Sequence, residues 1–544
     1  MTMRARILAA VLRLPAATGR AEVARGVRLP MRDGVELLAD VWTPAPGGEA
    51  SRAAVLVRTP YDRRGLDAIA ELLARRGHPV VVQNCRGTFG SGGRFVPFRD
   101  EAADGADTLG ILRARSWATR PVALIGASYL GHTAHAVAAE ADALVLAVTA
   151  ADFRSTVIHP SEVFALETGL IWSAGLLTQE LPLLRRTLAR LAIRRRMPRA
   201  LLARTEDADR LLLGHHYPPY QDWVEHDAPG DPWWEPVDHR PGLGALAPSV
   251  LIGGWYDPFL LGLLEDHRAL VAADRPTRLV IGSWTHGSPG VLAALLRESM
   301  RLLGPEAAPA SSPVTVHDRG ARRWADLASW PPATRQRALA LDGGGRLTAR
   351  PTGSTRVQWR VDPLDPPPPA GGRTLTPDFA GRRGQRTRER RADVAVFSTL
   401  PLRRAVVLAG APSVTLRVLA DGPEEWSVRL CDVDRLGVSR NLCDGYLRPT
   451  GAGGERTLSI PLSPLAHTVR RGHRLRLQIT GSGHPVHPAL AADSGSRTVL
   501  SGPGARSELL LPVLEGGWEA ADAEAHRLRR DGALLRRIRP RRAR

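Results

Sequence analysis

Over residues 22–150, short apolar runs alternate with longer stretches whose apolar positions recur at helical spacing. Strands are predicted at residues 35–41, 53–57, 79–82, 122–125 and 143–150, and helices at 66–75 and 101–115. The run at 79–82 is rich in valine, which is typical of a strand buried on both faces of a parallel sheet. Strands that alternate with helices in this way predict an α/β sheet.

The strand pattern stops between residues 151 and 243. Helical spacing takes over at 163–177 and 181–196, and an aromatic segment follows at 217–234. Strand-like runs resume at 249–252 and 278–281. We therefore predict a catalytic α/β domain made of residues 22–150 and 244–310, with residues 151–243 inserted as a helical cap.

After about residue 311 the pattern changes to short strands of alternating polarity, separated by Gly, Pro and Asp turns. Examples are residues 413–418, 427–431, 455–460 and 475–479. This pattern predicts a C-terminal all-β jelly-roll domain over residues 311–520. A basic tail is expected at 521–544.

Residues 121–131 combine a buried strand, a turn that carries Ser128, and the start of a helix. A serine hydroxyl is a poor nucleophile at neutral pH, so it needs a tight strand-to-helix turn where it can meet a histidine base and oxyanion donors. Gly126 keeps such a turn free of side-chain clashes. A Gly-x-Ser before a helix is also typical of a plain N-cap, so Ser128 needs partners elsewhere in the chain.

Two later strand ends supply such partners. Asp257 follows the run at 249–252, and His286 follows the run at 278–281. In an open α/β sheet, sites assemble at these carboxyl ends of the strands. The order Ser128, Asp257, His286 is that of α/β-hydrolases. We expect His286 to take the Ser128 proton and Asp257 to orient the imidazole.

Further motifs carry a resemblance to a known family. They are MRDGV at 31–35, RTPYD at 58–62, QNCRG at 83–87, GASYLG at 126–131, GWYD at 254–257, WTH at 284–286, RLCDV at 429–433 and NLCDG at 441–445. In this order and spacing they resemble the CocE/NonD-type, or peptidase S15-type, serine hydrolases, which are related to cocaine esterase, X-Pro dipeptidyl-peptidases and α-amino-acid ester hydrolases. The chain departs from relatives at Asn84, where they have aspartate, and at Pro258, where glycine is common.

The resemblance implies an α/β-hydrolase core with a helical cap and a jelly roll. It also implies two-step acyl transfer without cofactor or metal. The oxyanion hole would be made by the backbone N–H of Tyr129 and the hydroxyl of Tyr61. Candidate walls of the substrate pocket are Trp172, Trp255 and Phe259.

Two readings of the substrate stay open. Relatives that require a free α-amino group place carboxylates near the acyl pocket. Glu162 and Glu167 on the first cap helix are candidates for this role. A solvated helix face explains these two residues equally well. We prefer an ester or broad acyl hydrolase. An X-Pro dipeptidyl-peptidase or α-amino-acid ester hydrolase is the alternative, and a non-catalytic binder is a further one.

The composition is that of an ordinary globular protein, with 43% hydrophobic residues in 544. The formal net charge of +19 comes from arginine alone, because the chain has no lysine. Its clusters at 382–391 and 527–544 are not interleaved with aromatic residues, so we expect solvated segments rather than a nucleic-acid site.

Three cysteines without metal-like spacing fit a reduced compartment. The N-terminal apolar run, interrupted by Arg13, is too short for a secretory signal, and no apolar stretch is long enough to span a bilayer. We therefore expect a cytoplasmic protein that acts on a small ester, amide or short peptide, without a nucleic-acid or membrane partner. A homodimer stays open.

Overall fold

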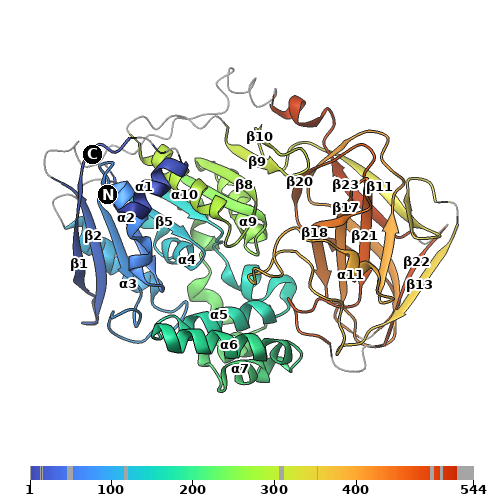
Figure 1. The fold of residues 1–544 in the computed structure, drawn as a ribbon, viewed down its shortest axis with the longest axis horizontal. Coiled ribbons are helices and arrows are strands. Elements are labelled where there is room, and N and C mark those ends of the chain that lie inside the picture. The colour runs from blue at the N-terminus through green and yellow to red at the C-terminus, as the bar shows by residue number, and fades with distance from the viewer. Residues whose placement is uncertain are drawn as a thin grey trace.

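The structure, a computed structural model, has two β-sheets and a layer of helices. It describes residues 2–12, 14, 16–45, 53–114, 121–304, 312–351, 353–451, 453–490, 495–502 and 506–522. Figure 1 shows the α/β part on the left, the all-β part on the right, and helices α5, α6 and α7 below the α/β part.

Within the described residues, the first sheet has ten strands in the order β1-β2-β4-β3-β5-β6-β7-β8-β9-β10. They are β1 (Ala21–Pro30), β2 (Glu36–Pro44), β3 (Ala54–Thr59), β4 (Val80–Asn84), β5 (Val122–Ala127), β6 (Ala143–Ala147), β7 (Ser249–Tyr256), β8 (Thr277–Thr285), β9 (Val314–Asp318) and β10 (Arg323–Leu327). Neighbours from β4 to β9 run parallel, and β1, β2 and β10 join antiparallel at the two edges. The carboxyl ends of β5, β7 and β8 therefore share one edge.

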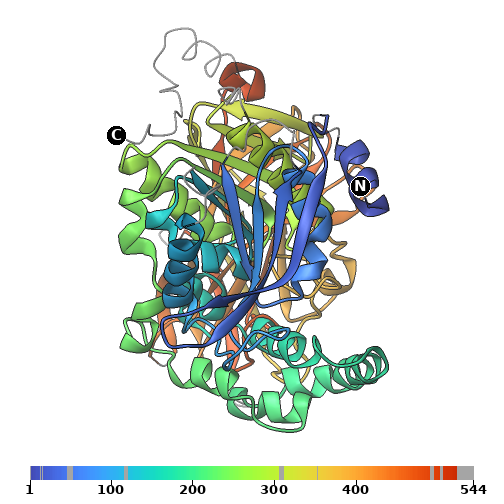
Figure 2. The same ribbon diagram turned by 90° about the vertical axis from the view of Figure 1, so that its left-hand side faces the viewer.

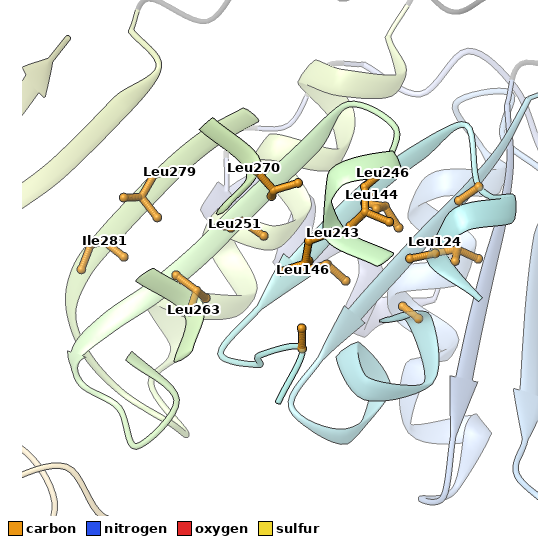
Figure 3. Packing of buried hydrophobic residues seen from close by; sticks show 14 of the residues in the cluster. Leu124, Leu144, Leu146, Leu243, Leu246, Leu251, Leu263, Leu270, Leu279 and Ile281 are labelled. Carbon is orange, nitrogen blue, oxygen red and sulfur yellow. The ribbon is translucent and has the colours of Figure 1, made fainter. Parts of the chain in front are cut away.

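Helices cover both faces of this sheet. Alternate residues of its strands point to opposite sides, so each face has an apolar core of its own beneath the helices. Leu144 and Leu146 of β6 belong to the core under α3 (Glu101–Arg113), α4 (Tyr129–His135) and α9 (Leu260–Ala272), part of which is shown in Figure 3. Val145 and Ala147 belong to the core under α2 (Asp67–Ala74) and α10 (Pro289–Leu303). The N-terminal α1 (Met3–Leu12) packs against α2 and α10.

Between β6 and β7 the chain leaves the sheet and forms a helical layer. Its helices are α5 (Leu166–Thr178), α6 (Leu183–Leu201), α7 (Thr205–Leu213) and α8 (Pro218–Glu225), and its short turns are η3 (Arg154–Ile158), η4 (Pro160–Glu162), η5 (Pro232–Val237) and η6 (Arg240–Ala245). The turns η1 (Arg63–Leu66) and η2 (Ala138–Glu140) lie within the α/β part. In Figure 2 the helical layer again lies below the sheet. Tyr220 and Trp223 anchor its core. No described helix combines the length and apolar character needed to cross a membrane.

The C-terminal part is all-β apart from α11 (Arg386–Glu389) and a helical segment at residues 517–522, within the residues that the structure describes. Its strands are β11 (Arg335–Asp342), β12 (Arg346–Thr348), β13 (Thr355–Arg360), β14 (Val394–Ser398), β15 (Val406–Gly410), β16 (Ser413–Ala420), β17 (Trp426–Val433), β18 (Ser439–Leu447), β19 (Gly454–Pro461), β20 (Leu465–Val469), β21 (Arg474–Thr480), β22 (Ser496–Ser501) and β23 (Glu508–Val513). They enclose a core that contains Trp426, Val428 and Leu430, alternate residues of β17.

Two strands that follow the expected domain boundary at residue 311 belong to the first sheet. Strands β9 and β10 extend the first sheet, and β9 runs parallel to β8. The alternating pattern of a short strand does not reveal which sheet the strand joins. The sequence pattern of β9 and β10 is therefore indistinguishable from that of the β domain that follows. The chain also returns to this edge, where Trp518 Nε1 donates to Asp318 Oδ2 at 2.6 Å. Residues 523–544, most of the expected basic tail, lie outside the described residues.

The arginine-rich segment 382–391 is only partly solvated, because Arg383, Arg386 and Arg390 are exposed whereas its other arginines are packed. Arg382 Nη2 lies 3.2 Å from Asp432 Oδ2, and Arg391 Nε donates to Asp393 Oδ1 at 2.8 Å. Arg388 is only 5% exposed. Carboxylates and carbonyls distant in sequence accept from these guanidinium groups, and a local charge run does not reveal such partners.

Candidate active site

Ser128 lies in the turn between β5 and α4. Its backbone has φ 57° and ψ −128°, a conformation in which L-residues are strained. The turn is held because Ser128 N donates to Ala147 O at 3.0 Å and Ser128 O accepts from Gly131 N at 2.8 Å. A Cβ on Gly126 would lie 2.2 Å from Leu130 O, so glycine is required there. This geometry is that of a nucleophile elbow.

Asp257 and His286 meet Ser128 at the same sheet edge. His286 Nε2 lies 2.9 Å from Ser128 Oγ, and His286 Nδ1 lies 2.7 Å from Asp257 Oδ2. Asp257 is completely buried, and its other oxygen, Oδ1, accepts from Phe259 N at 2.9 Å. The structure brings together all three residues that the strand-end argument selects.

This chain of contacts has a definite chemical meaning. A carboxylate can only accept, so Nδ1 of His286 carries the proton that faces Asp257. Nε2 is then a lone-pair acceptor for the Ser128 hydroxyl, the arrangement of a general base beside a serine nucleophile. The Phe259 ring stacks on the imidazole with a centroid distance of 5.4 Å and an interplanar angle of 26°, which limits its rotation.

Tyr61 follows β3 and packs on the apolar cluster that contains Tyr129 and Phe259, but it is not among the residues that line the cavity at Ser128. Burial raises the pKa of its hydroxyl to about 12, against the opposing effect of a hydrogen bond with Trp172. An indole N–H is only a donor, so the phenol oxygen accepts this bond and keeps its own hydrogen free to donate. Asn84 Nδ2 donates to Tyr61 O at 2.6 Å and to Thr59 O at 3.2 Å. An ionised aspartate could not make these bonds, so the departure at Asn84 supports the turn that carries Tyr61.

Tyr129 begins α4, so its backbone N–H is one of those that helix bonding leaves without a partner. Its side chain is buried below the elbow, where its oxygen accepts from Phe98 N at 2.8 Å and its hydroxyl donates to Glu101 Oε1. Burial raises the pKa of Tyr129 well above its usual value, and Glu101 adds to the shift.

Sequence reasoning missed Glu101. Its carboxyl group is buried, and burial raises its pKa to about 7 against the hydrogen bond from Tyr129 and the charge of Arg58. Oε2 of Glu101 makes no hydrogen bond within the described part of the chain. An acidic residue in the first turn of a helix is ordinary, so no feature of the sequence marks Glu101 as a residue that supports the elbow.

Comparisons with known proteins agree with this geometry. Residues 33–288 match the family model of the X-Pro dipeptidyl-peptidases (S15 family), and residues 307–490 match that of the X-Pro dipeptidyl-peptidase C-terminal non-catalytic domain. The chain belongs to the S15 and CocE/NonD-type serine hydrolases. Cocaine esterase from Rhodococcus sp. (strain MB1 Bresler) is 29% identical over 91% of this chain and 99% of its own length.

Solved structures confirm the predicted fold class of this S15-type hydrolase. An α-amino acid ester hydrolase has a TM-score of 0.76 at 21% identity and covers 92% of this chain and 98% of its own. A CocE/NonD family hydrolase from Staphylococcus aureus has a TM-score of 0.66 at 14% identity and covers 90% of this chain and 94% of its own. At these identities the likeness is one of fold.

The Ser128 side chain of this S15-type hydrolase opens into a small cavity of about 30 Å³. Beside Ser128 and Tyr129, its lining is Phe153, Val157, Ile158, Thr168, Trp172, Phe259 and Leu375. Trp172 and Phe259 thus line the cavity as expected, but Trp255 does not. Its indole donates to His317 O at 2.9 Å and packs on Trp330 with a centroid distance of 5.2 Å, away from Ser128.

The two candidate carboxylates of the cap are already engaged. Glu162 lies in η4 rather than on α5, and its Oε2 accepts from Arg154 Nη1 at 2.9 Å. Glu167 does lie on α5, where it is 1% exposed, and its Oε1 accepts from Thr376 N at 2.7 Å. Within the described residues, no cluster of three or more His, Cys, Asp or Glu could hold a metal ion.

Proposed function

We propose that Ser128 is the nucleophile of this serine hydrolase, with His286 as general base and Asp257 as the group that orients the imidazole. The observation that carries the proposal is the position of His286, which lies within hydrogen-bond reach of Ser128 Oγ on one side and of the buried Asp257 on the other. The two contacts give the imidazole the tautomer that base catalysis requires.

The reaction has two steps. Ser128 Oγ attacks the carbonyl carbon while His286 Nε2 takes the hydroxyl proton, and the tetrahedral intermediate collapses as the imidazolium returns the proton to the leaving alcohol or amine. Water then attacks the acyl-enzyme. His286 takes a proton from it and returns this proton to Ser128 Oγ, which leaves as the acid product is released.

The oxyanion of each intermediate would be bound by the N–H of Tyr129 and the hydroxyl of Tyr61. Both donors come from segments at the carboxyl edge of the sheet, one from the elbow and one from the end of β3. Preorganised donors of this kind act in a site without bulk water, where they stabilise developing charge strongly. The bond from Trp172 supports this role, because it leaves the Tyr61 hydrogen available.

We propose an ester as the natural substrate class. Among the described residues that line the Ser128 cavity there is no carboxylate to pair with a substrate α-ammonium group. Glu162 and Glu167 are engaged by Arg154 and Thr376. The name cocaine esterase, carried by a relative that aligns along almost its whole length, agrees with an ester.

Activity profiling tests both proposals. We expect p-nitrophenyl esters to be hydrolysed faster than X-Pro p-nitroanilides, with loss of activity and of fluorophosphonate labelling in Ser128→Ala. Exclusive cleavage of the X-Pro anilides would replace the ester with the dipeptidyl-peptidase alternative. Failure of the probe to label the folded wild-type protein would refute the assignment of Ser128.

We also propose a cytoplasmic location. Cys85, Cys431 and Cys443 are all free and buried, which suits a reducing compartment. Localisation of a tagged full-length chain by cell fractionation would test this proposal, and a secreted product would contradict it.

A further inference from the structure

A second cavity lies between the helical layer and the β domain. Its volume is about 120 Å³, and its lining includes Thr156 and Ser161 from the helical side, Pro258 after β7, and Ser427 from the β domain. Four charged side chains line it: Arg373, Arg388, Arg429 and Asp444. We call this cavity the arginine cleft.

The arginine cleft adjoins the Ser128 cavity. Val157 and Thr168 line both cavities, and they lie on η3 and α5. On the opposite side, Thr374 lines the cleft and the next residue, Leu375, lines the Ser128 cavity. A substrate with its carbonyl at Ser128 would reach the cleft past Val157 and Thr168.

The charges in the cleft do not balance. Three guanidinium groups face one carboxylate, Asp444, which lies 3.5 Å from Arg373 Nε and 3.5 Å from Arg429 Nη2. A buried cation that lacks a compensating anion is unfavourable. The lining thus has excess positive charge where a negatively charged group would be stabilised.

Two of the arginines retain unused donors. Arg388 is 5% exposed, its Nη1 donates to Pro368 O at 3.2 Å, and its Nε makes no hydrogen bond in the described part of the chain. Burial, and then the charge of Arg429, lower the pKa of Arg388 to about 9. Arg373 Nε is likewise buried without a hydrogen bond, although Asp444 is near.

Arg429 differs from the other two. Its Nη1 donates to Ala370 O at 2.6 Å and its Nη2 to Gly371 O at 3.0 Å, so it holds the loop that borders the cleft. We assign it a structural role and leave ligand binding to Arg373 and Arg388.

We propose that the arginine cleft is a subsite for a carboxylate carried by the substrate at a distance from the scissile carbonyl, with Arg373 and Arg388 as the binding groups. A planar guanidinium matches a carboxylate in shape and charge. This inference rests on the proposed function and names its substrate class, a half-ester of a dicarboxylic acid or an ester of similar charge.

The test compares esters that differ only in this charge. The substrates are p-nitrophenyl half-esters of glutarate, adipate and suberate, and the same esters with the far carboxylate methylated. In the wild-type protein, kcat/KM of the charged ester should exceed that of its methylated partner for at least one chain length. In Arg373→Gln this ratio should fall about tenfold or more, the loss expected for one charge-assisted hydrogen bond.

Arg335→Gln is the matched control, because Arg335 is an exposed arginine of the same domain, paired with Glu515 and outside the cleft lining. It should keep the wild-type ratio. A ratio of one or less for every chain length in the wild-type protein, or an unchanged ratio in Arg373→Gln, would overturn the subsite.

A binding measurement separates this failure from failure of the proposed function. Adipate should raise the melting temperature of Ser128→Ala in a concentration-dependent way, and less in the double variant with Arg373→Gln. If the wild-type protein hydrolyses no ester, the proposed ester activity fails while the adipate shift still decides the cleft. No shift in Ser128→Ala would overturn the carboxylate subsite, whatever the esterase activity.

Discussion

Replacing Tyr61 with phenylalanine removes one oxygen atom and isolates the proposed second oxyanion donor. The phenylalanine ring keeps the packing of the tyrosine ring in the apolar core of the helical layer. The hydrogen bonds of Tyr61 with Asn84 and Thr59 are made by the Tyr61 backbone, so they are retained. Loss of one oxyanion donor lowers kcat by roughly 10²-fold to 10³-fold, or about 2.7–4 kcal/mol of transition-state stabilisation. We expect Tyr61→Phe to lose kcat in this range while KM changes little.

The raised pKa of Tyr61 sets the pH range over which its hydroxyl can donate. With a pKa of about 12, about 1% of the phenol is ionised at pH 10, whereas a tyrosine at the ordinary value of 10.0 would be about half ionised. The wild-type kcat, corrected with Ser128→Ala for spontaneous ester hydrolysis, should therefore stay level up to about pH 10. A loss of kcat centred near pH 10 would refute this account of the Tyr61 environment.

Tyr217→Phe is the matched control. Burial also raises the pKa of Tyr217 to about 12, but this residue precedes α8, where its backbone N–H donates to Asp209 Oδ2 at 2.7 Å. Steady-state rates should be divided by the fraction of protein that a fluorophosphonate labels, so that only folded enzyme is counted. A Tyr61→Phe enzyme within threefold of wild type in kcat would remove Tyr61 from the proposed oxyanion hole.

Three further changes test other parts of the site. Asp257→Asn should lower kcat by about 10⁴-fold, since the amide favours the wrong imidazole tautomer, and stopped assays of p-nitrophenol release would measure it. Trp172→Phe removes the indole donor to Tyr61, and loss of this donor raises the pKa of the Tyr61 hydroxyl further. We expect kcat to fall by about twofold to tenfold, while the fluorophosphonate probe still labels Ser128. The pKa of Glu101 is about 7 in the folded protein, against 4.5 for an ordinary glutamate in the unfolded chain. Between these pH values the folded protein binds a proton that the unfolded chain has lost. The free energy of unfolding should therefore fall by about 3 kcal/mol as the pH rises from 4.5 to 7. Urea titrations of Glu101→Gln should lack this component, and an identical pH dependence in both proteins would contradict the raised pKa.

The three residues of the proposed triad could be predicted from sequence because parallel strands impose a common edge. Ser128, Asp257 and His286 each follow a recognisable apolar run, and the sheet order brings those runs together. The position of Trp255 could not be predicted in this way. The register of β7 with β8 shifts between Gly254 and Tyr256, and simple alternation of side chains does not foresee such an irregularity.

Long-range polar partners were a second limit. The sequence allows Glu167 to be either a carboxylate near the acyl pocket or part of a solvated helix face, yet Glu167 is buried and accepts from Thr376, a residue of the β-domain segment. Glu101 was equally inconspicuous, since its partner Tyr129 lies beyond the next strand. A sequence pattern reports the periodicity of one element, whereas these contacts depend on how separate elements meet.

The proposed bond cleavage and the proposed substrate binding are carried out by different parts of the protein. Ser128, Asp257 and His286 all belong to the α/β sheet edge, so the groups proposed for bond cleavage come from one rigid element. The groups around the substrate come from elsewhere: Trp172 from α5, and Leu375 and Arg373 from the segment between β13 and β14. Changes in that segment can therefore alter which ester is accepted without moving the His286 contacts. Because Thr376 of this segment bonds to Glu167 of α5, both sides of the substrate cavity are tied to each other as well as to the sheet.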